Sequence, residues 1–398
     1  MKLHLPSGPL VGEIDLPISK SIANRYVIIS ALTGSKLSLS EDLPEDVRIL
    51  QEALNSDSSE INIGMAGTAM RFLTAFYAVQ EGKTVVLTGS ERMKQRPIAE
   101  LVDALRNLGA EIEYVENEGF PPLKIAGKKF KGGEVDIPAS ISSQFISALM
   151  MIGPTMEHGL QIHLSGKVLS RPYIELTADC MRNCGVGVTL DENLISIPVG
   201  TYKVANSNIE SDWTAASYFY SLAAVRPNSK FLLKELKLNS PQGDSILANW
   251  FERMGVSSFQ KGNGVEITSS DSFCLPKELD FSANPDLAQT FAFLAAALGQ
   301  PLKLTGLDNL RLKETDRIAA LQTELEKLGV SVLVDGNSMT VSGSISVKEA
   351  AIKTYNDHRM AMSAALLSTL IPVEIETPDV VAKSFPGFWT QVERFSIV

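Results

Sequence analysis

A repeated unit of about 70 residues constrains this chain more than any other feature. Four segments combine an amphipathic helix, a glycine and an alternating strand, and their glycines stand 70 to 76 residues apart. A glycine directly after a periodic helix is typical of its left-handed end, and the alternation that follows indicates a half-buried strand. The helices with their glycines cover residues 101–109, 176–185, 246–255 and 321–329, and the strands are expected at 110–115, 186–190, 256–259 and 330–334.

A second helix type, more apolar and therefore more buried, recurs in phase with the first. It predicts six units in all. The spacing from the last of these helices, counted through the C-terminus and on from the N-terminus to the first, is somewhat shorter than one unit, which suggests that the two ends together complete one unit. These helices are expected at 19–32, 67–79, 142–152, 212–225, 286–298 and 357–370.

Alternating helices and strands predict an α/β architecture, and a chain of 398 residues is long enough for two domains of three units each. We expect one domain at 18–210 and the other at 1–17 plus 211–398, with the N-terminal strand joined to the C-terminal half. The crossings near 16–17 and 206–211 would form a hinge.

Composition excludes several classes. The chain has 36 Lys and Arg against 46 Asp and Glu, so its net charge of -10 provides no general attraction for nucleic acid or anionic membranes. Apolar runs such as 290–298 are shorter than the roughly 20 residues of a membrane span, and the N-terminus does not resemble a signal peptide. Three cysteines fit a reducing cytoplasm, and Cys180 with Cys184 lacks the further ligands of a zinc site.

Cationic residues accompany the starts of the buried helices. Caps explain the serines, threonines and aspartates there, but not cations such as Lys20, Arg25 and Arg71, which the positive end of a helix dipole disfavours. A polyanionic ligand at several helix N-termini reconciles the two observations. Three loops add further cations, each of which alone would suit a solvated surface: Arg96, Lys313 with Arg317, and Lys383. Together they suit two anionic substrates bound between the domains.

Competing signatures are missing from the sequence. It has no phosphate-binding G-x-x-x-x-G-K-[ST] run, no dinucleotide-binding G-x-G-x-x-G at a helix start and no nucleophile elbow. His358 is the one histidine in a polar constellation, where it serves either catalysis or the structure of a helix N-terminus. Covalent catalysis by Ser or Cys is not favoured.

Seven motifs in order carry a resemblance that covers essentially the whole chain. They lie at 20–25, 66–71, 92–97, 142–145, 310–317, 355–362 and 382–386. With these motifs the chain resembles the enolpyruvyl transferase family, in its branch of 5-enolpyruvylshikimate-3-phosphate synthases. This resemblance implies two domains built from six βαβαββ units, an active site in the interdomain cleft, and transfer of the enolpyruvyl group of phosphoenolpyruvate to the 5-hydroxyl of shikimate 3-phosphate.

The resemblance also implies the site residues. Shikimate 3-phosphate is expected against Ser21, Arg25, Ser142, Ser143, Gln144, Ser170, Tyr173, Asp286, Asn309 and Lys313. Phosphoenolpyruvate is expected against Lys20, Gly67, Arg96, Gln144, Arg317, Arg359 and Lys383. Asp286 is expected to act as the base and Glu314 with Lys20 as the acid pair, with His358 a further catalytic candidate. We expect glyphosate to compete with phosphoenolpyruvate, no cofactor or metal, no nucleic-acid or membrane partner, and a cytoplasmic monomer.

Two departures and two alternatives accompany this interpretation. Met65 stands where the family usually has Asn, and segment 40–48 carries acids beyond the usual pattern. A UDP-N-acetylglucosamine enolpyruvyl transferase would rely on a cysteine in the loop at 92–97, which has none. A non-catalytic anion-binding module would need the cations, but not Asp286 and Glu314 together.

Overall fold

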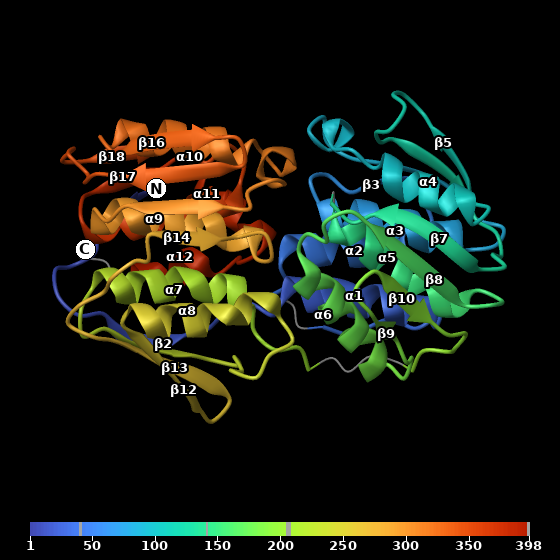
Figure 1. Ribbon diagram of the computed structural model, residues 1–398, viewed down its shortest axis with the longest axis horizontal. Helices are drawn as coiled ribbons and strands as arrows, with labels where there is room; N and C mark the ends of the chain where they lie inside the picture. The colour runs from blue at the N-terminus through green and yellow to red at the C-terminus, as the bar shows by residue number, and fades with distance from the viewer. Residues whose placement is uncertain (40–41, 141, 204–207, 396–398) are drawn as a thin grey trace. The chain divides into compact units, whose positions relative to one another are not determined.

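The computed structural model describes residues 1–39, 42–140, 142–203 and 208–395 (Figure 1). The chain divides into two compact units. We call Lys20–Ile209 the continuous unit, and Met1–Ser19 with Glu210–Val398 the discontinuous unit. Helices and mixed sheets occur in both, so the predicted α/β class is confirmed.

The continuous unit contains two four-stranded sheets, in the orders β3-β4-β6-β5 and β7-β8-β10-β9. The strands are β3 Glu60–Asn62, β4 Thr84–Thr88, β5 Glu111–Tyr114, β6 Leu123–Ala126, β7 Gly133–Pro138, β8 Leu160–Ser165, β9 Thr189–Leu190 and β10 Leu194–Ile197. The helices are α1 Lys20–Leu32, α2 Glu45–Asn55, α3 Gly67–Ala78, α4 Ala99–Asn107, α5 Ser143–Ile152 and α6 Arg171–Asn183.

The discontinuous unit contains the sheets β12-β13-β11-β2, β14-β15-β17-β16 and β1-β19-β18. The strands are β1 Lys2–Leu3, β2 Val11–Ile14, β11 Lys230–Leu233, β12 Val256–Lys261, β13 Gly264–Ser269, β14 Glu278–Asp280, β15 Leu302–Thr305, β16 Ser331–Asp335, β17 Ser338–Ser342, β18 Ala350–Ile352 and β19 Val373–Ile375. The helices are α7 Trp213–Val225, α8 Ile246–Met254, α9 Ala288–Leu298, α10 Arg317–Lys327, α11 His358–Ala364 and α12 Phe388–Glu393.

The four-stranded sheets share one topology, which is the structural form of the sequence repeat. In each, a parallel pair of strands is followed by two antiparallel ones. The three-stranded sheet begins in the same way, with β18 parallel to β19, and its third strand is β1 from the other end of the chain. The count of six units stays a prediction, because the described residues form five sheets.

The glycines that ended the predicted amphipathic helices adopt left-handed backbone conformations, as expected. Their φ angles are +100° at Gly109, +87° at Gly185, +117° at Gly255 and +83° at Gly329. A residue with a Cβ is strained in that region, so glycine ends these helices at little cost.

Several predicted element bounds were wrong: the helices expected to start at 176 and 321 begin at Arg171 and Arg317, and three further elements differ for reasons visible in the structure. The strand expected at 186–190 is reduced to Thr189–Leu190, because Gly187 weakens strand pairing just before it. The helix expected at 286–298 begins at Ala288, after a 3₁₀ turn at Pro285–Leu287. The helix expected at 357–370 ends at Ala364 and continues as a 3₁₀ segment, where the hydroxyls of Ser368 and Thr369 donate to backbone carbonyls three residues earlier.

No helix in the described ranges combines the length and the apolar character that crossing a membrane requires.

Candidate active site

The predicted site residues of the discontinuous unit gather around one buried guanidinium, that of Arg317 at the start of α10. Its Nε donates to Asp357 Oδ2 at 2.7 Å, its Nη1 to Asp286 Oδ1 at 3.2 Å and its Nη2 to Glu314 Oε2 at 3.0 Å. Burial disfavours the charged guanidinium, but the three carboxylates outweigh burial and raise the pKa of Arg317 above its ordinary value. One arginine therefore fixes three acidic side chains that lie far apart in sequence.

Asp286 was expected at the first turn of a buried helix, and its position is slightly different. It lies in the 3₁₀ turn at Pro285–Leu287, and the N-cap residue of α9 is Leu287. Its Oδ2 accepts from Arg359 Nη2 at 2.7 Å, in addition to the contact with Arg317, and Lys313 Nζ lies 3.9 Å from Oδ1. The carboxylate therefore contacts three cations, a pattern that helix capping does not require.

Glu314 is the second predicted proton-transfer residue, and it lies in the same network. Its Oε1 accepts from Lys383 Nζ at 2.8 Å, while its Oε2 accepts from Arg317. The side chains of Glu314 and Lys383 are about nine-tenths buried. The structure thus brings together the two residues predicted as acid and base with the predicted phosphoenolpyruvate cations of this unit.

His358 and Asn309 take less direct positions. His358 begins α11 and is buried, with Nδ1 3.8 Å from Asp357 Oδ1. Asn309 precedes the 3₁₀ turn at Leu310–Leu312, on the chain segment that leads to Lys313. A catalytic role for His358 and a ligand role for Asn309 stay predictions.

In the continuous unit, four of the predicted residues lie at helix N-termini. Lys20 opens α1, Gly67 opens α3, Ser142 caps α5 and Ser170 is the N-cap residue of α6. These ends expose backbone N–H groups and the positive poles of the helix dipoles, which together suit phosphate or carboxylate.

Lys20 has a partner that the sequence did not predict. Its Nζ lies 3.0 Å from Oδ2 of Asp46, which is buried on α2. Asp46 belongs to the acid-rich segment at 40–48, so at least this acid holds a predicted substrate-binding lysine. Only the unusual number of acids in that segment could have indicated the pair, because 26 residues separate the two partners.

Arg96 lies directly over Gly67. It follows the 3₁₀ turn at Met93–Gln95 and is 8% exposed. A Cβ added to Gly67 would lie 2.5 Å from Arg96 Nη1, closer than real Cβ contacts. Glycine at the start of α3 is therefore what allows the guanidinium to reach this helix end.

The serine-rich start of α5 is bonded to α3. Gln144 Nε2 donates to Thr68 Oγ1 at 3.1 Å. The Ser142 hydroxyl oxygen caps the helix by accepting a hydrogen bond from the backbone N–H of Gln144. Ser143 follows as the first residue of the helix and is buried. These contacts bring Ser142, Ser143 and Gln144 next to the Gly67 turn.

The side chain of Arg25 is buried among protein groups. It is 3% exposed and donates to Thr177 Oγ1, Ser147 Oγ and the carbonyls of Ser21 and Tyr173. Burial lowers its pKa. Arg25 thereby ties α1 to α5 and α6, and its direct contact with substrate stays a prediction.

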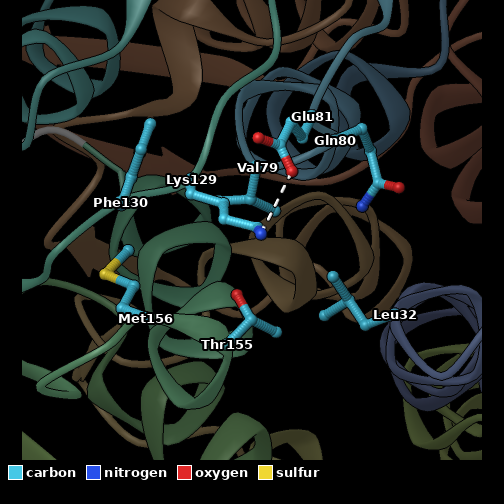
Figure 2. A pocket seen from close by; sticks show the side chains of 8 residues that line it. All are labelled: Leu32, Val79, Gln80, Glu81, Lys129, Phe130, Thr155 and Met156. Atoms are coloured by element: carbon cyan, nitrogen blue, oxygen red, sulfur yellow. Dashed lines mark ion pairs between the residues drawn. The ribbon is translucent and has the colours of Figure 1, made fainter.

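The pocket in Figure 2 lies elsewhere in the continuous unit. Its cavity volume is about 220 Å³, and its lining includes Leu32 at the end of α1, Val79 just after α3 and Thr155 beyond α5. Lys129 and Glu81 form an ion pair of 3.3 Å at its wall. It therefore lies at the ends of these helices opposite to the predicted ligands and does not belong to the candidate site.

Within the described ranges, no group of three His, Cys, Asp or Glu side chains is placed to hold a metal ion.

Comparisons with known proteins show the family of this chain. A family model described as EPSP synthase (3-phosphoshikimate 1-carboxyvinyltransferase) matches residues 40–392. A 3-phosphoshikimate 1-carboxyvinyltransferase of Bacteroides fragilis is 44% identical over 98% of this chain and 97% of its own, and one of Colwellia psychrerythraea is 36% identical over 98% of both. An EPSP synthase structure from Acinetobacter baumannii has the same fold, with a TM-score of 0.76 and 23% identity over all of this chain and 98% of its own. The resemblance inferred from the motifs is thus confirmed, and this chain belongs to the EPSP synthase (3-phosphoshikimate 1-carboxyvinyltransferase) family.

Proposed function

We propose that this protein transfers the enolpyruvyl group of phosphoenolpyruvate to the 5-hydroxyl of shikimate 3-phosphate and releases phosphate. The observation that carries the proposal is the network around Arg317, where two candidate proton-transfer carboxylates contact the cations predicted to bind phosphoenolpyruvate. Membership of the family supports the same activity.

Anion recognition falls to Arg317, Arg359 and Lys383. Arginine presents paired N–H donors that match a carboxylate or phosphate, and Lys383 adds a point charge. Asp286 and Glu314 accept hydrogen bonds from these donors. A substrate anion would compete for them, so that its binding releases carboxylate oxygens for proton transfer.

Chemistry proceeds in two steps. In the addition, the 5-hydroxyl oxygen bonds to the enol carbon of phosphoenolpyruvate, Asp286 takes the hydroxyl proton, and the methylene carbon gains a proton from Glu314 or Lys20. In the elimination, the methyl carbon returns a proton, the double bond re-forms and the C–O bond to phosphate breaks. The arginines stabilise the anionic groups of the tetrahedral intermediate.

Shikimate 3-phosphate is assigned mainly to the continuous unit. Ser142 and Ser143 at the start of α5, with Gln144, offer hydroxyl and amide donors to its phosphate, and Ser170 and Tyr173 belong to the start of α6. Ser21, Arg25, Asp286, Asn309 and Lys313 complete the proposed set, with Lys20, Gly67 and Arg96 on the phosphoenolpyruvate side.

The alternatives have weaker support. A UDP-N-acetylglucosamine enolpyruvyl transferase would need a cysteine in the loop at 92–97, where Arg96 and Lys94 stand without one. A binding module would have no use for Asp286 and Glu314 on the same arginine as the anion donors.

We propose that the protein works as a cytoplasmic monomer. The free thiols of Cys180, Cys184 and Cys274 support a reducing compartment. Burial raises the pKa of Cys180 to about 12, so this thiol stays protonated and unreactive.

A phosphate-release assay tests the function. The purified protein should release phosphate only when phosphoenolpyruvate and shikimate 3-phosphate are both present, and the product should carry an enol ether at the 5-oxygen by NMR. Binding of both substrates without phosphate release would instead favour the binding module.

A further inference from the structure

The segment that delivers Asp357 to Arg317 has an unusual backbone. It connects β18 to α11, and both Tyr355 and Asn356 have positive φ angles, of 55° and 56°. Left-handed backbone is disfavoured for residues with a Cβ, most of all for a bulky tyrosine. Such a conformation persists only where its surroundings hold it, so the contacts of Tyr355 need an explanation.

Those contacts lead to a buried carboxylate outside the proposed site, that of Glu324 on α10. Tyr355 Oη donates to Glu324 Oε1 at 2.6 Å, and the backbone N–H of Lys353 donates to Oε2 at 3.2 Å. The side chain of Glu324 is fully buried, and the half-exposed Lys327 balances its charge at 2.8 Å. Burial and the bond to Glu324 raise the pKa of Tyr355 to about 12, so its hydroxyl stays a donor.

Glu324 and Arg317 lie seven residues apart on one helix, which is two turns, so both face the same segment. Glu324 holds that segment at Lys353 and Tyr355, and Arg317 holds it at Asp357. The position of Asp357 also affects the first turn of α11, because its Oδ1 caps that helix by accepting a hydrogen bond from the backbone N–H of Arg359.

We propose that Glu324 and Tyr355 are positioning residues for the substrate anion: their hydrogen bond fixes the left-handed turn that aligns Asp357, and through it Arg317 and Arg359. The inference rests on the proposed function, since it takes these arginines to bind phosphoenolpyruvate. It assigns neither Glu324 nor Tyr355 a contact with substrate.

Tyr355→Phe tests the proposal, because it removes the hydroxyl and keeps the ring. We expect the KM for phosphoenolpyruvate to rise about tenfold, as for loss of one hydrogen bond to a buried carboxylate, with the KM for shikimate 3-phosphate unchanged. Tyr220→Phe is the matched control, since it removes a tyrosine hydroxyl bonded to Ser258 in the same unit, away from the site. If both variants have the same KM for phosphoenolpyruvate within twofold, the proposal is overturned.

Two further variants separate positioning from stability. Glu324→Gln and Glu324→Leu both lose the charge, but only Glu324→Gln keeps an acceptor for the Tyr355 hydroxyl. The KM for phosphoenolpyruvate should therefore be close to the wild-type value in Glu324→Gln and raised in Glu324→Leu. Lys327→Gln removes the ion pair of Glu324 and should leave that KM unchanged. If Glu324→Gln and Glu324→Leu raise the KM equally, or Lys327→Gln raises it as much, the Tyr355 bond is not the positioning contact.

Hydrogen exchange provides a readout that does not need activity. Backbone amides at 355–359 should exchange faster in Tyr355→Phe than in Tyr220→Phe. Faster exchange would support the positioning role of the Tyr355–Glu324 hydrogen bond even if the wild-type protein released no phosphate, because the lack of phosphate release would count against the proposed function alone. Equal exchange in the two variants would overturn the positioning role.

Discussion

The guanidinium of Arg96 lies against the backbone of Gly67, so close that a single added methyl group at residue 67 would overlap Nη1. The atoms that would have to move are the far end of a long side chain rather than backbone. A substitution at 67 therefore disturbs the proposed anion site much more than it disturbs the fold.

Gly67→Ala should raise the inhibition constant of glyphosate and the KM for phosphoenolpyruvate, because the displaced guanidinium intrudes on the space beside the helix end. The melting temperature should change little. Steady-state kinetics with glyphosate as a competitor measures both constants. Gly187→Ala is the control, since its added Cβ meets nothing within 4 Å. Unchanged constants in Gly67→Ala would mean that Gly67 does not line the site.

Asp286→Asn should lower kcat by at least about a hundredfold, since the amide cannot take the proton of the 5-hydroxyl. The fold and most shikimate 3-phosphate binding should survive. Asp212→Asn gives a comparison, because Asp212 caps α7 by accepting the Ala215 amide, a task that asparagine also performs. A lowered melting temperature with nearly normal kcat in Asp286→Asn would show a structural role instead.

Glu314→Gln should slow the exchange of phosphoenolpyruvate methylene protons with solvent, because the amide cannot carry the proton to that carbon. Proton NMR in deuterated water follows this exchange directly. Lys383 and Arg317 retain an acceptor in the variant, so substrate binding should weaken less than exchange slows. Normal exchange would leave the acid role to Lys20 alone.

Arg317→Met should destabilise the protein by about 3–5 kcal/mol, because it leaves the fully buried Asp357 without its cation. Adding Asp357→Asn should recover part of that loss, since the uncompensated charge is removed. Urea unfolding of the two single variants and the double variant gives the coupling energy. Additive losses would indicate that the two side chains do not interact strongly.

Asp244→Asn should weaken the pH dependence of stability. Burial, and secondarily the charge of Asp286, raise the pKa of Asp244 from 3.8 to about 6. The folded chain keeps this proton where the unfolded chain has lost it, so stability falls as pH rises through this window. Between pH 4.5 and pH 7.5, the free energy of unfolding should fall by about 2 kcal/mol less in the variant than in the wild type. Equal losses in urea unfolding would refute the assignment.

The elements that could be predicted from the sequence depend on local signals. Gly109 and Gly255 mark helix ends because the left-handed backbone conformation of a single residue is enough to end a helix. The cations of the sequence, Arg317 among them, already predicted an anion site, but the contacts of Arg317 with Asp286 and of Asp286 with Arg359 were not predictable from local signals, because tertiary packing bridges their sequence separation.

Other features had no local signal. The pairs Lys20 with Asp46 and Tyr355 with Glu324 join residues 26 and 31 positions apart, and nothing in their spacing indicates contact. The bounds at Ala288 and Ala364 were missed because the apolar pattern runs through the 3₁₀ segments unchanged. Periodicity reports which side chains are buried, and hydrogen bonding decides the helix type.

The pairing of β1 with β19 and of β2 with β11 has a consequence for how the chain folds as it is synthesised. The continuous unit can begin to fold once residue 209 has left the ribosome, but strand Val11–Ile14 waits for its neighbour at Lys230–Leu233, and Lys2–Leu3 waits for Val373–Ile375. Contacts that span so much of the chain close slowly. Strands β1 and β2 are therefore among the last to find their partners, and until then their unpaired strand edges are open to mispairing.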